Sequence, residues 1–136
     1  MRRVVVDTNV LVAGLITADA QRPTARVVDE MLNGRLLFLS SPELLAEYRA
    51  VLLRPRLAAL HALNAAEVDQ ILTEVTLNAL WREPLGDGNA PDPGDNHLWA
   101  LLDHEPRAIL VTGDQRLLGE PHDKAMVVSP ATFFEV

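Results

Sequence analysis

Two short apolar runs near opposite ends of the chain constrain the fold most strongly. Residues 4–6 are three valines, and residues 109–111 are Ile-Leu-Val. Such runs, without polar alternation, are typical of strands buried on both faces, as in parallel sheets. Helical patterns separate them, so the sequence predicts a three-layer α/β/α fold with a mostly parallel central sheet of four or five strands.

Caps, breakers and apolar periodicity predict the other elements. A helix is expected to follow Asp7 over the apolar stretch 10–16, and another runs from Pro23 until Asn33-Gly34 ends it. Ser41-Pro42 predicts the start of a further helix that ends at Arg54-Pro55. The remaining predictions are a strand over 36–39, a helix over about 65–80, a loop over 86–94, a helix around 98–102, a strand at 127–128 and a final helical turn from 129.

Composition predicts one globular domain over residues 1–136. Hydrophobic residues make up 49% of the 136 residues and charged residues 23%, which is near the globular average. There is no cysteine, so disulfides, thiolate nucleophiles and cysteine-bound zinc are excluded, and a reducing cytoplasm is the expected location. Asp7 interrupts the apolar run after Arg2-Arg3, which argues against an export signal, and no stretch is long enough for a bilayer crossing.

The net charge leaves open whether the partner is a nucleic acid. A charge of −7 and a pI of about 4.9 argue against binding nucleic acid through a basic surface. That objection weakens if several carboxylates share one divalent cation, because the ion reverses the field that a phosphate would meet.

Two acids follow predicted strands. Asp7 comes directly after residues 4–6, and Asp114 follows residues 109–111 by three positions. Because ligands bind at the carboxyl edge of a parallel sheet, both side chains are expected at the same place. Each alone has an ordinary explanation as the cap of the next helix.

Two further acids occupy predicted helices. Glu47 lies at the margin of the apolar stripe of its helix, where a solvated residue paired with Arg49 or Arg54 is the ordinary explanation. Asp95 shares a face with Leu98, and capping is its ordinary role. Chance explains the set poorly, since all four acids are expected at one edge. Clustered carboxylates repel one another unless a hard cation such as Mg²⁺ or Mn²⁺ is bound, and these ions bridge to phosphates.

The ordered motifs resemble those of the PIN-domain ribonucleases, especially the toxins of bacterial toxin–antitoxin pairs. The resemblance covers nearly the whole chain, and the segments that carry it are VVVDTNVLVAGL, SPELLAEYRAVL, DPGDNHLWALL, AILVTGDQRLL and VVSPATFFEV. Many relatives carry an acid where this chain has Asn96, which leaves open whether Asp92 substitutes as an auxiliary ligand.

The resemblance implies a metal-dependent endoribonuclease that uses Mg²⁺ or Mn²⁺. Asp7, Asp95 and Asp114 would be metal ligands, and Glu47 a ligand or a residue that positions water. The implied partners are an RNA substrate and a small antitoxin whose basic side chain enters the acidic cleft; a homodimer is also plausible. The residues expected to orient the carboxylates are Asn9, Thr112 and Asp92.

Arginines are the candidates for holding the RNA backbone, because guanidinium binds phosphate in a bidentate manner. Surface solubility is the ordinary explanation for each one. The candidates are Arg22, Arg26, Arg49, Arg54, Arg56 and Arg116. The histidines His61, His97, His104 and His122 have no ligand spacing and are expected in surface or packing roles, and Trp81 and Trp99 are expected in the core.

Three alternatives fit the sequence less well. A receiver domain needs adjacent acids after its first strand and a suitable late lysine, and the single lysine, Lys124, is in the wrong context. A haloacid-dehalogenase-like phosphatase needs a second acid where this chain has Asn9. A non-catalytic PIN-fold module that recognises RNA or a protein partner is the main rival, and the presence of all four acids disfavours it.

Overall fold

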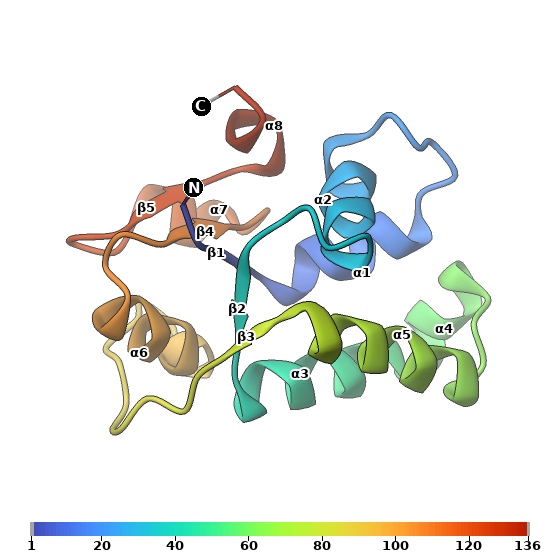
Figure 1. Cartoon of the computed structure of the whole chain (residues 1–136), viewed down its shortest axis with the longest axis horizontal. Coiled ribbons are helices and arrows are strands. Elements are labelled where there is room, and N and C mark those ends of the chain that lie inside the picture. Colours follow the sequence, from blue (N-terminus) through green and yellow to red (C-terminus); the bar gives the residue numbers. More distant parts are fainter. Residues whose placement is uncertain (1, 136) are drawn as a thin grey trace.

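A parallel sheet runs through the centre of the molecule, described here by a computed structural model of residues 2–135 (Figure 1). Five strands form it in the order β3-β2-β1-β4-β5, and every neighbouring pair is parallel. The strands are β1 (Val4–Val6), β2 (Phe38–Ser40), β3 (Leu80–Trp81), β4 (Ile109–Val111) and β5 (Met126–Val128).

Helices connect the strands and flank the sheet, which confirms the three-layer α/β/α prediction. Two lie between β1 and β2, namely α1 (Thr8–Ile16) and α2 (Pro23–Leu32). Between β2 and β3 are α3 (Pro42–Leu52), α4 (Pro55–His61) and α5 (Ala65–Asn78). The 3₁₀ turn η1 (Pro93–Asp95) and α6 (Asn96–His104) precede β4, α7 (Gln115–Gly119) precedes β5, and α8 (Pro130–Phe133) follows it.

Local sequence signals set most helix starts. The Ser41 hydroxyl accepts a hydrogen bond from the backbone N–H of Leu44, with Pro42 in the first turn, as predicted. Asn64 and Glu67 form a reciprocal capping box at the start of α5, which supplies partners for two backbone N–H groups.

Some predicted boundaries were wrong. Strand β2 begins at Phe38 and not at residue 36, and α5 ends at Asn78, so that Leu80 belongs to an edge strand instead of the predicted helix. Pro55 starts α4, a helix that was not predicted. Trp81 is 38% exposed on the edge strand, which contradicts the expected core position, whereas Trp99 is buried as expected.

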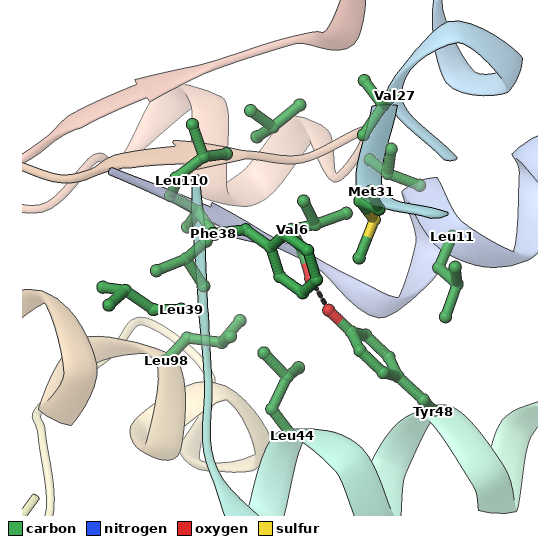
Figure 2. Close-up of a cluster of buried hydrophobic side chains, with 14 of the residues drawn as sticks. Val6, Leu11, Val27, Met31, Phe38, Leu39, Leu44, Tyr48, Leu98 and Leu110 are labelled. Carbon is green, nitrogen blue, oxygen red and sulfur yellow. Dashed lines mark hydrogen bonds between the residues drawn. The ribbon is translucent and has the colours of Figure 1, made fainter. Parts of the chain in front are cut away.

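The core between the sheet and α3 positions the carboxyl edge (Figure 2). Phe38 and Leu39 of β2 and Leu44 of α3 belong to one hydrophobic cluster, and all three are fully buried. The buried Tyr48 hydroxyl donates a hydrogen bond to the backbone carbonyl of Val6. Because this bond joins Tyr48 of α3 to Val6, the last residue of β1, it brings their chain neighbours, Glu47 and Asp7, toward each other.

None of the helices in residues 2–135 combines the length and the apolar character that a membrane crossing requires.

Gly14 allows α1 and α2 to approach closely. A Cβ at this position would lie 2.5 Å from both the Thr24 carbonyl oxygen and a Val28 methyl carbon. At Gly119, which is also helical, a Cβ would meet nothing within 4 Å.

We therefore expect Gly14→Ala to lower the free energy of unfolding by about 2 kcal/mol, because α1 and α2 must separate. Gly119→Ala is the matched control and should leave stability unchanged or raise it by up to about 1 kcal/mol. Urea denaturation of both variants measures this difference. Equal effects would contradict the close packing of α1 on α2.

Candidate functional site

The pairing of β1 with β4 brings two acids to the carboxyl edge of the sheet. Val6 is in register with Val111, and the backbone N–H of Asp7 donates to the Val111 carbonyl at 3.0 Å. Asp7 caps α1 and Asp114 caps α7. The ordinary explanation of these acids as caps is therefore correct, but it does not exclude a second role.

Asp7 is the most enclosed acid of the site, with 4% of its surface exposed. Its Oδ1 accepts from the backbone N–H of Thr8 at 2.8 Å. Its Oδ2 accepts from the Thr112 hydroxyl at 2.8 Å and from the Asn9 amide at 3.1 Å. Burial raises the pKa of Asp7, although the hydrogen bonds from Thr112 and Thr8 oppose the rise.

Thr112 and Asn9 connect Asp7 to the segment that carries Asp114. The backbone N–H of Asp114 donates to the Thr112 hydroxyl at 3.0 Å, and that of Gly113 donates to Asn9 Oδ1 at 2.8 Å. The Asp114 Oδ1 accepts from the backbone N–H of Arg116 at 2.8 Å. The contacts of Asn9 and Thr112 are those expected of residues that orient carboxylates.

Glu47 is held by two side chains from other elements. Its Oε1 accepts a hydrogen bond from the Thr8 hydroxyl, and its Oε2 lies 2.8 Å from Nε2 of His97. The hydrogen bond from His97 is the main cause that lowers the pKa of Glu47, and the nearby charge of Arg54 lowers it further. Glu47 is thus anchored between α1 and α6, in contrast to a freely solvated side chain.

Asp95 stands at the junction of η1 and α6, where its side chain forms no capping bond. Burial raises its pKa to about 6, and the charges of Asp7, Glu47, Asp92 and Asp114 add to that rise. Asp92 itself is exposed and accepts from the backbone N–H of Gly94 at 2.8 Å. It contributes negative charge but does not line the hollow described next.

All four predicted acids line one hollow of about 560 Å³ at the carboxyl edge. Its polar wall also includes Thr8, Asn9 and Arg54. Its apolar wall is formed by α1, α3 and α4 through Val12, Ala13, Ile16, Val51 and Leu57. The sequence positions 7, 47, 95 and 114 therefore meet in space.

The chemistry of this donor set fits a hard cation. The four acids offer only oxygen ligands, which Mg²⁺ and Mn²⁺ prefer, and a divalent ion would relieve the repulsion that adds to the effect of burial on the pKa of Asp95. Within residues 2–135, however, no three acidic or histidine side chains are close enough to hold one ion together. Binding would thus require side-chain movements that bring the carboxylates closer together. The hydrogen bonds to Asp7 and Glu47 do not prevent it, since carboxylate oxygens have further lone pairs.

The predicted RNA-binding arginines are dispersed. Arg54 lines the acidic hollow, whereas Arg49 forms an ion pair with Asp69 at 2.8 Å. Arg116 donates to the Pro91 carbonyl at 2.7 Å and lies 3.4 Å from Glu120. Arg26 stacks over Phe134, and Arg22 and Arg56 are exposed. Of this set, only Arg54 lines the acidic hollow.

His97 is a site residue that sequence reasoning placed in a packing role. Its ring contacts Glu47, which raises the pKa of His97 against the opposing effect of burial, and its Nδ1 is buried without a hydrogen-bond partner in the described chain. No local pattern reveals this contact, because its two residues lie 50 positions apart. His61 and His122 are buried and hydrogen-bonded, as packing residues are expected to be.

A comparison with protein-family models supports the same interpretation. The model of the PIN domain matches residues 3–116, a range that begins before β1 and includes all four acids. The chain belongs to the PIN domain family. Members of this family are generally metal-dependent nucleases. Searches of the curated proteins and of the solved structures gave no match.

Burial, with the charges of the neighbouring acids, raises the pKa of Asp95 and so predicts a pH-dependent stability. Its pKa of about 6 lies above the ordinary 3.8, so ionised Asp95 opposes folding. This penalty is absent below about pH 4, grows as the pH rises to about 6, and is complete above that.

In the presence of EDTA we expect Asp95→Asn to stabilise the PIN domain by about 1 kcal/mol near pH 8, after allowance for solvent screening, and by almost nothing near pH 4. Urea denaturation at the two pH values measures the difference. The exposed Asp87, which lies outside the hollow, provides the control Asp87→Asn. A stabilisation that is the same at both pH values would count against the cost of ionised Asp95 as its cause.

Proposed function

We propose that this PIN domain is a ribonuclease that hydrolyses RNA phosphodiester bonds with Mg²⁺ or Mn²⁺. The observation that carries the proposal is the single hollow lined by Asp7, Glu47, Asp95 and Asp114. Such a cluster suits phosphate chemistry, since hard cations bound to carboxylates also bind phosphate oxygens.

In this proposal Asp7, Asp95 and Asp114 hold the cation. When bound, the ion supplies an activated water and stabilises charge on the phosphate oxygens. Asn9 and Thr112 keep the Asp7 carboxylate oriented toward the hollow through bonds of 3.1 and 2.8 Å. These two residues thereby limit the rearrangement that cation binding requires.

Glu47 has a different position from the three aspartates. Both of its oxygens are engaged, one by Thr8 and the other by His97. Held in this way, its carboxylate can accept a hydrogen bond from the attacking water and fix the direction of attack. We therefore assign Glu47 to water positioning, with direct cation binding as its alternative role.

Arg54 is the basic side chain best placed to bind the substrate. It lines the same hollow as the acids, and a guanidinium at that point can bind a phosphate next to the scissile one. It also offsets part of the negative charge that would repel RNA.

A toxin role in a toxin–antitoxin pair, in the cytoplasm, is part of the proposal. It rests on the resemblance of the motifs to those of PIN-domain toxins. A small antitoxin would insert a basic side chain among the acids and block the hollow. Co-purification with the product of a neighbouring small gene, together with loss of cleavage, tests this role; a complex that leaves cleavage unchanged would contradict it.

Cleavage of mixed RNA in Mn²⁺ tests the nuclease function. We expect Asp7→Asn and Asp114→Asn to reduce the cleavage rate by at least about 100-fold, because each removes a charged ligand. Asp87→Asn should retain the wild-type rate. The non-catalytic alternative predicts no metal-dependent products from the wild type, and full activity in either aspartate variant would refute the residue assignment.

A further inference from the structure

The amino edge of the sheet, opposite the acids, gathers positive charge. Arg3 directly precedes β1, Arg107 lies two residues before β4, and Arg35 lies three residues before β2. Backbone hydrogen bonds of 2.9 Å from Val4 to Leu37 and from Ile109 to Arg3 hold these strand starts side by side. The arginines are therefore grouped by the sheet itself.

Two adjoining hollows lie along this edge. The first, of about 700 Å³, has Arg2, Arg3 and Arg107 on its wall, and the second, of about 590 Å³, has Arg2 and Arg35. Both hollows share Arg2 and Leu37. We call the two together the amino-edge groove.

Few carboxylates offset the arginines of the amino-edge groove. Glu105 lines it, but that carboxylate already pairs with Arg3 and with Arg82, each at 3.0 Å. Glu30 lines the second hollow. Within residues 2–135, Arg2, Arg35 and Arg107 form no ion pair. Three exposed guanidinium groups thus remain for an external anion on a chain whose net charge is −7.

Aromatic rings border the same groove. Phe133 and Phe134, at the end of α8, line the second hollow, and both are half-buried. Their ring centroids are 5.2 Å apart, and the Arg26 guanidinium stacks 3.8 Å from the Phe134 ring. In Figure 1, α8 lies at the end of the sheet where β1 begins, and Val4 of β1 lines the same hollow as the two rings.

We propose that the amino-edge groove binds single-stranded RNA. Arg2, Arg35 and Arg107 bind backbone phosphates, and a base packs against Phe133 or Phe134. Guanidinium groups next to aromatic rings provide both interactions that sequence-tolerant single-strand binding uses. An acidic peptide would use the arginines but would have no specific need for the rings.

This site adds a substrate-binding surface to the proposed function. It depends on that function in one respect, which is that RNA is taken as the nucleic acid. The strands that separate the two edges have at most three residues, which corresponds to a length of about 10 Å. A long RNA can therefore contact both edges. Binding at the amino-edge groove would hold RNA near a hollow whose own charge repels it. The groove would thus supply affinity that the acidic hollow lacks.

The test is binding of a fluorescently labelled, unstructured RNA of about 20 nucleotides to the full chain, followed by anisotropy in EDTA over a range of salt concentrations. We expect Arg35→Ala combined with Arg107→Ala to raise Kd at least about 10-fold, and to reduce the salt slope by about 0.7 for each arginine removed. Lys124→Ala is the control for charge loss, since Lys124 is exposed and lines neither hollow. Phe134→Leu should raise Kd about 5-fold with an unchanged salt slope.

The proposal would be overturned if the double arginine variant lost no more affinity than Lys124→Ala. It would also be overturned if the wild type did not bind the RNA. Tighter binding of a labelled polyglutamate peptide than of RNA would instead assign the groove to an acidic protein. Cleavage assays separate the two proposals. A wild type that binds RNA through the groove but does not cut it refutes the nuclease alone, whereas cleavage with groove-independent binding refutes the groove alone.

Discussion

The parallel pairing of β1 with β4 is the constraint on which the candidate site depends. It places Asp7 beside Thr112, and the Thr112 hydroxyl then contacts both the Asp7 carboxylate and the backbone N–H of Asp114. The buried hydrogen bond from Tyr48 to Val6 adds α3 to this arrangement, so that Glu47 faces the same hollow. Residues that are distant in sequence therefore come together because of the strand register and one buried hydroxyl. The negative charges of the acids repel one another and disfavour this arrangement.

The raised pKa values of two of the acids reflect this unfavourable arrangement. Burial and neighbouring carboxylates raise the pKa of both Asp7 and Asp95, which means that the folded state holds their ionised forms at a cost. Ionisable groups whose charge is unfavourable for folding are found mainly at functional sites. A divalent cation relieves the cost directly, whereas the His97 contact relieves it only at Glu47. The PIN domain therefore has a site whose charge is complementary to a metal ion, with positive charge collected at the opposite edge of the sheet.

Much of this architecture could be predicted from sequence, because strand ends and helix caps are local signals. Asp7 and Asp114 follow from apolar runs that end at a polar residue, and α3 from Ser41-Pro42. The two-residue strand β3 could not be separated from the preceding helix, since its pairing with β2 is a long-range event. Contacts such as His97 with Glu47 and Arg49 with Asp69 join different helices, and no periodicity encodes them. The arginines at the amino edge precede three different strands, and only the pairing of these strands brings them together.

Whether these acids hold a divalent cation can be tested by anomalous scattering from a crystal soaked in Mn²⁺. We expect one or two peaks in the hollow, at about 2.0–2.2 Å from carboxylate oxygens of Asp7, Asp95 and Asp114. Absence of a peak there, in crystals that bind Mn²⁺ elsewhere on the surface, would contradict this expectation.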